Sequence, residues 1–383
     1  MSQIKTSSAK GRYDETRGMI FNRTGPMAFE RILVPLDGSR SAEKALFHAA
    51  RLARAFGSRV LLLRVLDTHS AIFEQHPSTS AWRLHKLEAD RYIRSIVQHA
   101  ALRGIECDWY LTEGRPGEQI IQFIQSHEVD LVIISAHGQG EAYTFAFGGT
   151  AQKVASASGI SCVVSRDGDR AEPDSGHYRR ILIPVDGSRR AEWAIQVASM
   201  IAVDAPTELV LLEVVSLLEI LGRNPLTQEE KMLRERLAEC NRNTAEVYLR
   251  EASDTHGAGL RIRTRIETSG NVASTILNVA ADENADLIVM AAHEPGDDQF
   301  RIHKSVCQSV LARSRRPVLV LQQGGDRIVR SNSAHEVNLL ERKPVVLQPD
   351  NYGFSWSVSV QGKARPAVNG HPPLQGPERS PGR

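Results

Sequence analysis

The sequence repeats itself, and this repeat constrains the fold more than any other feature. The segment Arg31-ILVPLDGSRSAEKAL returns as Arg180-ILIPVDGSRRAEWAI, 149 positions later. Further along, Asp130-LVIISAH returns as Asp286-LIVMAAH at an offset of 156, so seven residues are inserted in the second copy. A period this long indicates a duplicated domain, because solenoid repeats recur every 20–50 residues or so. We therefore predict two domains of one fold, at residues 29–166 and 178–322, joined by a linker at 167–177.

Each copy alternates short apolar runs with amphipathic segments. The predicted strands of the first copy are Ile32–Leu36, Val60–Leu66, Glu106–Thr112, Leu131–Ser135 and Ser161–Ser165. Those of the second copy lie near 180–185, 208–215, 260–267, 286–291 and 317–321. The segments between them carry apolar residues at spacings of three and four, which is typical of one helix face. Apolar strands separated by helices predict an α/β fold, with a five-stranded parallel sheet in each copy and helices on both faces.

Composition and charge exclude several classes of protein. Hydrophobic residues make up 41% of the chain, and 47 Lys and Arg balance 45 Asp and Glu, which disfavours a nucleic-acid partner. Apolar runs fall short of the roughly 18 residues of a membrane span, and residues 1–27 show no apolar signal core. The four cysteines form no CxxC pair, so we expect reduced thiols and a cytoplasmic protein that does not enter a membrane.

The two ends of the chain differ in character from the repeats. We expect residues 1–28 to form a disordered arm and the Pro-rich residues 323–383 to form a largely disordered tail. Within this tail, Phe354, Trp356, Val358 and Val360 alternate with polar residues, which leaves open an edge strand with Val345–Leu347 as its partner.

A ligand of such a fold is expected at the carboxyl ends of the strands, where the strand order reverses. Asp37 follows the first strand and suits a ribose, an adenine edge or a magnesium ion. Gly148, Gly149 and Thr150 precede a helix whose free N–H groups and positive dipole end suit a phosphate. The loop has neither a Walker A lysine nor the GxGxxG spacing of dinucleotide sites.

These motifs resemble those of the universal stress protein family. Its members carry a V-P-x-D-x-S turn after the first strand and a G-x2-G-x9-G-[S/T] nucleotide loop after the fourth. The resemblance covers both copies, about three quarters of the chain. It implies two flavodoxin-like or adenine-nucleotide-hydrolase-like sheets with strand order 3-2-1-4-5, ATP binding in some members, and pairing of the two halves of a tandem member.

The resemblance transfers to the first copy with two departures. Ser135 stands at the first loop glycine, Gly138 and Gly148 keep the other two, and Gly149 replaces the hydroxyl residue, with Thr150 next to it. We expect weakened rather than abolished binding. The implied nucleotide-binding residues are Pro35, Asp37, Val65, Ser135, His137, Gly138, Gly148, Gly149 and Thr150. No metal site is predicted, apart from Mg²⁺ that ATP could bring to Asp37.

The second copy has lost the loop. Ala291, Glu294 and Lys304 stand at the three glycine positions, and Ser305 alone is kept. The Glu294 carboxylate would repel phosphate, so we expect ATP in domain 1 only and a pairing or scaffold role for domain 2. His293 repeats His137, and the sequence leaves open whether these imidazoles contact phosphate or pack the loop. Asp186 repeats Asp37, and for Asp186 we favour a structural role.

The functional hypothesis is a cytoplasmic stress-response protein that binds ATP, or another adenine nucleotide, through domain 1. One alternative is a nucleotide-free scaffold formed by the two paired halves. A weak ATPase is a further alternative, disfavoured because the sequence places no general base. Association of two chains into a homodimer, and the identity of any protein partner, stay open.

Overall fold

The computed structural model describes residues 29–68, 79–98, 107–138, 148–166, 176–216, 227–292, 301–322 and 339–345. Domain 1 consists of β1 (Arg31–Leu36), α1 (Arg40–Phe56), β2 (Arg59–Leu66), α3 (Thr79–Gln98), β3 (Cys107–Glu113), α4 (Pro116–Ser126), β4 (Leu131–Ser135), α5 (Gly149–Ala157) and β5 (Ser161–Ser165). The predicted strands agree with these bounds to within a residue or two.

Domain 2 repeats the same order of elements. It consists of β6 (Arg180–Val185), α6 (Arg189–Ala202), β7 (Glu208–Ser216), α7 (Gln228–His256), β8 (Arg261–Ser269), α8 (Val272–Asp282), β9 (Leu287–Ala291), α9 (Arg301–Arg313) and β10 (Val318–Leu321). The helix α7 is nine residues longer than α3, its counterpart in domain 1.

Local sequence signals explain where the helices begin and end. Ser39 and Ser188 accept hydrogen bonds from the backbone N–H groups of Ala42 and Ala191, and so cap the first helix of each domain. Gly57 ends α1 in the left-handed conformation at a φ of 72°, which costs a glycine little. Pro116 begins α4 at a position where its missing N–H is not needed.

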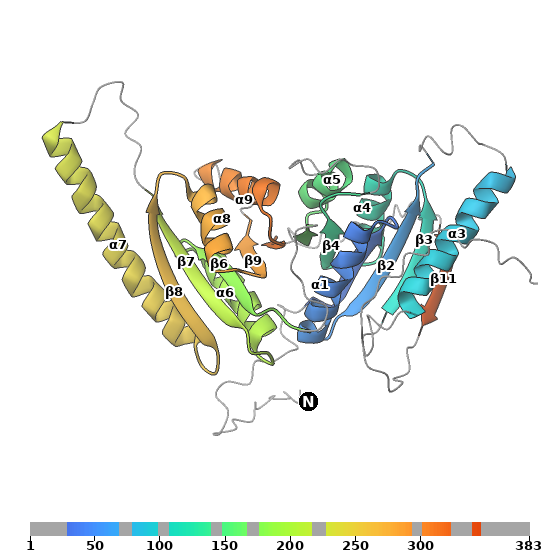
Figure 1. Cartoon of the computed structure of the whole chain (residues 1–383), viewed down its shortest axis with the longest axis horizontal. Helices are drawn as coiled ribbons and strands as arrows, with labels where there is room; N and C mark the ends of the chain where they lie inside the picture. Colours follow the sequence, from blue (N-terminus) through green and yellow to red (C-terminus); the bar gives the residue numbers. More distant parts are fainter. Residues whose placement is uncertain are drawn as a thin grey trace, which may run out of the picture. The chain divides into compact units, whose positions relative to one another are not determined.

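Each domain has the strand order that the resemblance implies. The sheet of domain 1 runs β3-β2-β1-β4-β5, all parallel, and domain 2 runs β8-β7-β6-β9-β10, also all parallel. Helices α1, α3, α6 and α7 contribute to the core on one face of the sheet, while α4, α5, α8 and α9 cover the other (Figure 1). The predicted α/β fold is therefore confirmed.

The two sheets join edge to edge through β5 and β10, which pair antiparallel. The central pair is Val163 opposite Leu319, and these two residues occupy the same position in the two copies. An antiparallel contact between equivalent strands relates the domains by an approximate two-fold axis. Side chains from both domains pack into continuous cores on the two faces of the sheet.

Two equivalent side chains reinforce this junction. Arg166, which follows β5, donates to the carbonyl oxygens of Leu311 and Ala312 near the end of α9. Gln322, which follows β10, donates through Nε2 to the carbonyl oxygen of Ala155 near the end of α5, at 3.1 Å. Each domain thus satisfies carbonyl groups at the C-terminus of the other domain's last helix, groups that a helix leaves unpaired.

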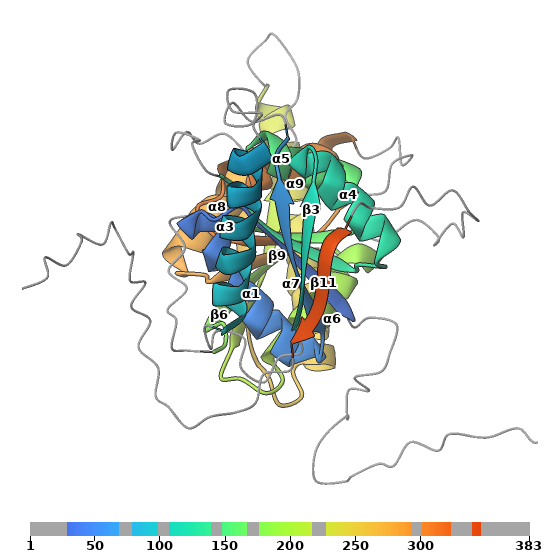
Figure 2. The same cartoon turned by 90° about the vertical axis from the view of Figure 1, so that its right-hand side faces the viewer.

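One strand was not predicted. β11 (Leu339–Val345) pairs antiparallel with β3 and adds a sixth strand to the sheet of domain 1 (Figure 2). These residues lie within the tail that the sequence predicts to be largely, though not wholly, disordered. Their mixed charges hide the alternation of a strand, and Pro344 is tolerated because β11 is an edge strand. The arm at 1–28, most of the linker, and the edge strand allowed at 354–360 lie outside the described residues.

The junction predicts that a core truncation at the domain boundary destabilises the chain. Leu319 is fully buried, so Leu319→Ala leaves a cavity between the domains and should lower the free energy of unfolding by about 2–5 kcal/mol. Urea unfolding followed by circular dichroism measures this loss. Leu87→Ala, on an exposed face of α3, serves as the control with an expected change below about 0.5 kcal/mol. An unchanged midpoint for Leu319→Ala would contradict the described junction.

Candidate functional site

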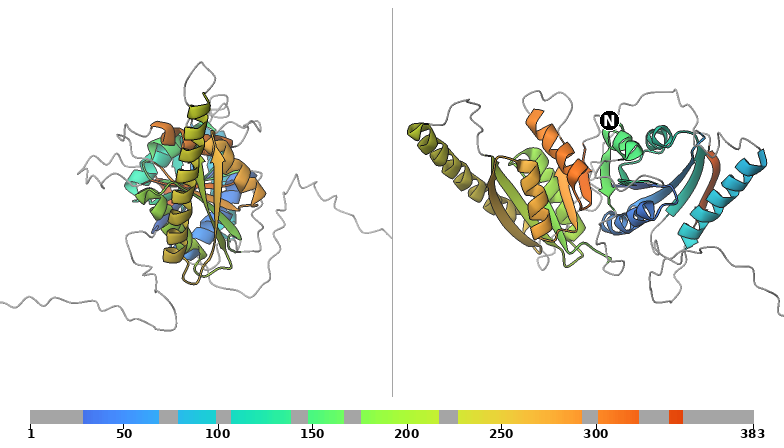
Figure 3. Two further views of the ribbon diagram at one scale, coloured as in Figure 1. Left: turned by 90° about the vertical axis from the view of Figure 1, so that its left-hand side faces the viewer. Right: turned by 45° about the horizontal axis from the view of Figure 1, so that its top comes forward.

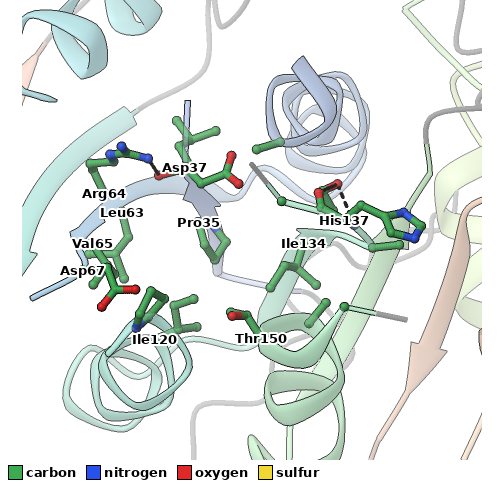
Figure 4. Close-up of a pocket in the computed structure, with 18 of the residues that line it drawn as sticks. Pro35, Asp37, Leu63, Arg64, Val65, Asp67, Ile120, Ile134, His137 and Thr150 are labelled. Atoms are coloured by element: carbon green, nitrogen blue, oxygen red, sulfur yellow. Dashed lines mark hydrogen bonds between the residues drawn. The ribbon is translucent and has the colours of Figure 1, made fainter. Parts of the chain in front are cut away.

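A cavity of about 340 Å³ opens at the carboxyl ends of the strands of domain 1. Its walls come from β1, β2 and β4 with the turns that follow them, from α1 and α3, and from the N-termini of α4 and α5 (Figure 4). Eight of the nine predicted site residues line it: Pro35, Asp37, Val65, Ser135, His137, Gly138, Gly148 and Thr150. Gly149 is exposed and is not among the lining residues.

The turn after β1 holds Asp37 in a fixed position. Asp37 Oδ1 accepts a hydrogen bond of 2.8 Å from the backbone N–H of Ser39, whose own hydroxyl caps α1. Gly138, in the turn after β4, approaches the same carboxylate so closely that a Cβ there would lie 2.7 Å from Asp37 Oδ2. A glycine fits here because the backbone of the turn lies so close to Asp37 that any side chain would displace the carboxylate. This agrees with the glycine of the loop motif.

Two helices direct uncapped N-termini at this cavity. Gly148 is the N-cap of α5 and Arg115 is the N-cap of α4, and neither makes a side-chain capping bond. By contrast, Ser39, Ser188 and Asn271 cap α1, α6 and α8 through their side chains. Within the described part of the chain, no side chain at the N-cap takes the first N–H groups of α5, so a ligand oxygen can accept from them, and the positive dipole ends of both helices favour an anion.

Ser135 uses its hydroxyl within the protein. The Oγ atom lies 2.7 Å from Ser41 Oγ and 2.7 Å from the carbonyl oxygen of His137. Since a carbonyl only accepts and a hydroxyl carries one hydrogen, Ser135 donates to His137 and Ser41 donates to Ser135. The serine at the first glycine position is therefore buried and satisfied by α1 and its own loop. The imidazole of His137 points away from the cavity in Figure 4.

Sequence reasoning missed several lining residues: Leu36, Ala42, Leu63, Arg64, Asp67, His85, Pro116, Ile120, Ile134, Ala136 and Ala151. Arg64 carried a signal, because it is a cation inside an otherwise apolar strand. Its guanidinium donates to the carbonyl oxygen of Leu36 and lies over the ring of Tyr92. Burial lowers the pKa of Arg64, and the carboxylate of Asp37 acts in the opposite direction. His85 had no signal, because only the packing of α3 brings it to the cavity.

Domain 2 has a smaller cavity of about 140 Å³ at the equivalent place, lined in part by Asp186, Ser188, Met290 and Ala291. The two domains carry opposite charges at one equivalent strand position. Glu213 in β7 repeats Arg64 in β2, and Asp186 repeats Asp37. Both domains have a Tyr–Glu contact between their second and first helices. In domain 1 it joins Tyr92 and Glu43, and in domain 2 Tyr248 donates to Glu192 at 2.8 Å.

Two acidic groups therefore replace an acid–base pair in domain 2. Burial, and then the charge of Asp186, raise the pKa of Glu213 to about 7. Arg64 thus offsets the charge of Asp37 among the residues that line the domain 1 cavity, whereas Glu213 is not among those that line the domain 2 cavity, where Arg190 is the lining cation. The predicted repulsion by Glu294 cannot be compared, because Glu294, like His293, lies outside the described residues.

In the ranges that the structure describes, no three His, Cys, Asp or Glu side chains gather as a metal site would require. Nor is any helix within those ranges sufficiently long and apolar to cross a bilayer. Mg²⁺ at Asp37 stays a prediction.

The raised pKa of Glu213 predicts a dependence of stability on pH. The carboxyl is protonated more readily in the folded than in the unfolded state, so stability should fall as the pH rises from about 4.5 to 7. Glu213→Gln removes this loss, and above pH 7.5 it should be more stable than the natural chain by about 1–2 kcal/mol, allowing for partial exposure. Urea unfolding of the natural chain and of Glu213→Gln at pH 5 and pH 8 measures the pH dependence and the gain in stability. Equal stabilisation by Glu213→Gln at the two pH values would contradict the shift.

Comparison with known proteins agrees with this geometry. The family model described as universal stress protein family matches residues 28–166 and 177–322. The universal stress protein Rv2005c of Mycobacterium tuberculosis is 22% identical over 304 residues, which cover 76% of this chain and 97% of that protein. MJ0577 of Methanocaldococcus jannaschii, also a universal stress protein, is 28% identical over 159 residues, 38% of this chain and 96% of that protein.

A solved structure shows the same fold. The crystal structure of a universal stress protein from Archaeoglobus fulgidus superposes with a TM-score of 0.53 at 19% identity, and the match covers 78% of this chain and 99% of that one. The repeat, the strand order and the family match together cover both domains. The chain belongs to the universal stress protein family, as a member that carries two family domains in tandem.

Proposed function

We propose that domain 1 binds an adenine nucleotide, most simply ATP, in the cavity at the carboxyl ends of β1 and β4. The observation that carries this proposal is the pair of uncapped helix N-termini at one cavity. A triphosphate would take the N–H groups at the start of α5 in place of a side-chain cap. Thr150 Oγ1, on the first turn of the same helix, supplies a hydroxyl where Gly149 has none.

The opposite wall suits the base and the sugar. This wall of the cavity is apolar and suits a purine ring; it is formed by Pro35, Leu63, Val65 and Ile120. The cavity volume of about 340 Å³ lies within the range of small-ligand sites. Asp37 is fixed by its turn and can accept a hydrogen bond from a ribose hydroxyl or an amino group. Asp37 and Asp67 are the lining carboxylates that an incoming Mg²⁺ would meet.

The charge difference between the domains supports a single site in each chain. Arg64 beside Asp37 makes the cavity of domain 1 tolerant of an anion, whereas Asp186 of domain 2 has the acid Glu213 where Asp37 has that cation. The smaller volume there adds to this difference. We propose that domain 2 serves as the paired scaffold that fixes the β5 edge of domain 1, and that the chain acts in the cytoplasm as a stress-response protein. A nucleotide-free scaffold is the competing function.

Nucleotide content tests the proposal directly. The full chain is purified without added nucleotide and denatured, and the supernatant is analysed by anion exchange. ATP with Mg²⁺ is then titrated into nucleotide-free protein by calorimetry. We expect one adenine nucleotide bound per chain. An empty protein that releases no heat at millimolar ATP would favour the scaffold function instead.

A pair of equivalent variants assigns the site. Gly148 has an extended backbone at φ −60° and ψ 146°, so Gly148→Val is accommodated there but places two methyl groups at the start of α5. We expect at least a tenfold weaker ATP affinity, with a loss of stability of no more than about 1 kcal/mol because valine is a poorer N-cap than glycine. Lys304→Val at the equivalent position of domain 2 is the matched control and should leave affinity unchanged. Equal losses in both variants would place the nucleotide elsewhere.

A further inference from the structure

The helix α7 carries an apolar stripe that the fold of its own domain does not use. Exposed apolar side chains recur on it, with 55% of Met232, 60% of Leu233, 41% of Leu237 and 55% of Val247 accessible. Figure 1 and Figure 3 show the N-terminal turns of α7 extending beyond the ends of β7 and β8, the strands on which its second half packs.

The stripe follows the spacing of a coiled-coil seam. Leu233, Leu237, Cys240, Thr244 and Val247 are separated by four, three, four and three residues, and all five are exposed. The hydroxyl of Thr244 is satisfied within the helix, because it donates to the carbonyl oxygen of Cys240. A single exposed leucine needs no explanation, but five positions of one heptad seam form a surface of the kind that packs against another helix.

The opposite side of α7 is the one its own domain buries. Ala245, Leu249 and Ala252 are buried against the sheet, and their spacing places them roughly 130° around the helix from the stripe. The helix therefore has two apolar faces over its second half, one covered within the domain and one facing outward.

Charge complementarity indicates what covers the outward face. Glu229, Arg236, Asn243 and Arg250 recur every seven residues along one flank of the stripe. In an antiparallel helix pair with Leu237 opposite Cys240 of the partner subunit, Glu229 lies nearest Arg250 of the partner subunit, and Arg236 lies nearest Asn243 of the partner subunit. A slip of one heptad instead places Arg236 near Arg250 of the partner subunit, where like charges repel.

We propose that a second copy of this chain docks on the α7 stripe as an antiparallel two-helix contact with Cys240 near its two-fold axis. The contact is separate from the β5–β10 junction and leaves the cavity of domain 1 open. A seam of this length is at the small end of specific interfaces, so we expect a reversible dimer in the micromolar range.

Sedimentation of the full chain over a range of concentrations tests the dimer. We expect a concentration-dependent shift from monomer to dimer, and at least a tenfold higher dissociation constant for Leu237→Glu. Leu87→Glu is the matched control, because Leu87 is a similarly exposed leucine, at 54%, on the equivalent helix α3. A chain that stays monomeric at all concentrations, or equal effects of the two variants, would overturn the proposal.

Charge exchange tests the register. Glu229→Arg and Arg250→Glu should each weaken dimerisation by a few fold, and the double variant should restore it, because each exchanged pair keeps opposite charges. A simple loss of helix stability would not be rescued in this way. Additive weakening in the double variant would overturn the proposed antiparallel register.

Cys240 provides a chemical test without any new cysteine. It is exposed, whereas Cys107, Cys162 and Cys307 are buried, and burial raises the pKa of each of these three thiols to about 12. A short bis-maleimide should therefore yield a covalent dimer, and Cys240→Ser should abolish it. A Cys240 that resists maleimide in a monomeric chain would show that another segment of the same chain covers the stripe, and would also overturn the proposal.

Discussion

The antiparallel pairing of β5 with β10 is the contact on which the rest of the structure depends. It joins two five-stranded sheets whose last strands would otherwise expose unpaired backbone groups, and unpaired edges invite association. Because the pairing strands are equivalent, the reinforcing contacts come in equivalent pairs, as Arg166 and Gln322 show at the ends of α9 and α5. The duplication therefore places within one chain the kind of symmetric contact that homodimers form between chains.

The same duplication lets the two cavities diverge. A paired scaffold needs the strands, the capped first helices and the Asp-Gly-Ser turns of both copies, and these are kept. It does not need, in both copies, the glycine loop or the charge at the position of Arg64 in β2 and Glu213 in β7. The exchange of Arg64 for Glu213 is an example, because it reverses the local electrostatics without disturbing the register of β7 on β6.

Much of the fold and part of the site followed from local signals. The alternation of apolar strands and helices, the caps at Ser39 and Ser188, and Pro116 at the start of α4 each depend on neighbouring residues alone. The glycine spacing located Gly138 and Gly148, because close backbone approach is a local requirement. By contrast, the partner of the Ser135 hydroxyl was not predictable, because Ser41 lies 94 residues away and meets it only when α1 packs on β4.

Spacing and residue type alone revealed the duplication and showed which copy kept the loop glycines, and the family resemblance implied the strand order. Which side chains meet depends on how the elements pack. This packing brought His85 and Arg64 to the cavity and aimed two uncapped helix ends at one space. It also paired β11 with β3 and left one face of α7 outside the core. These features depend on contacts between segments distant in sequence, where local propensity carries no information.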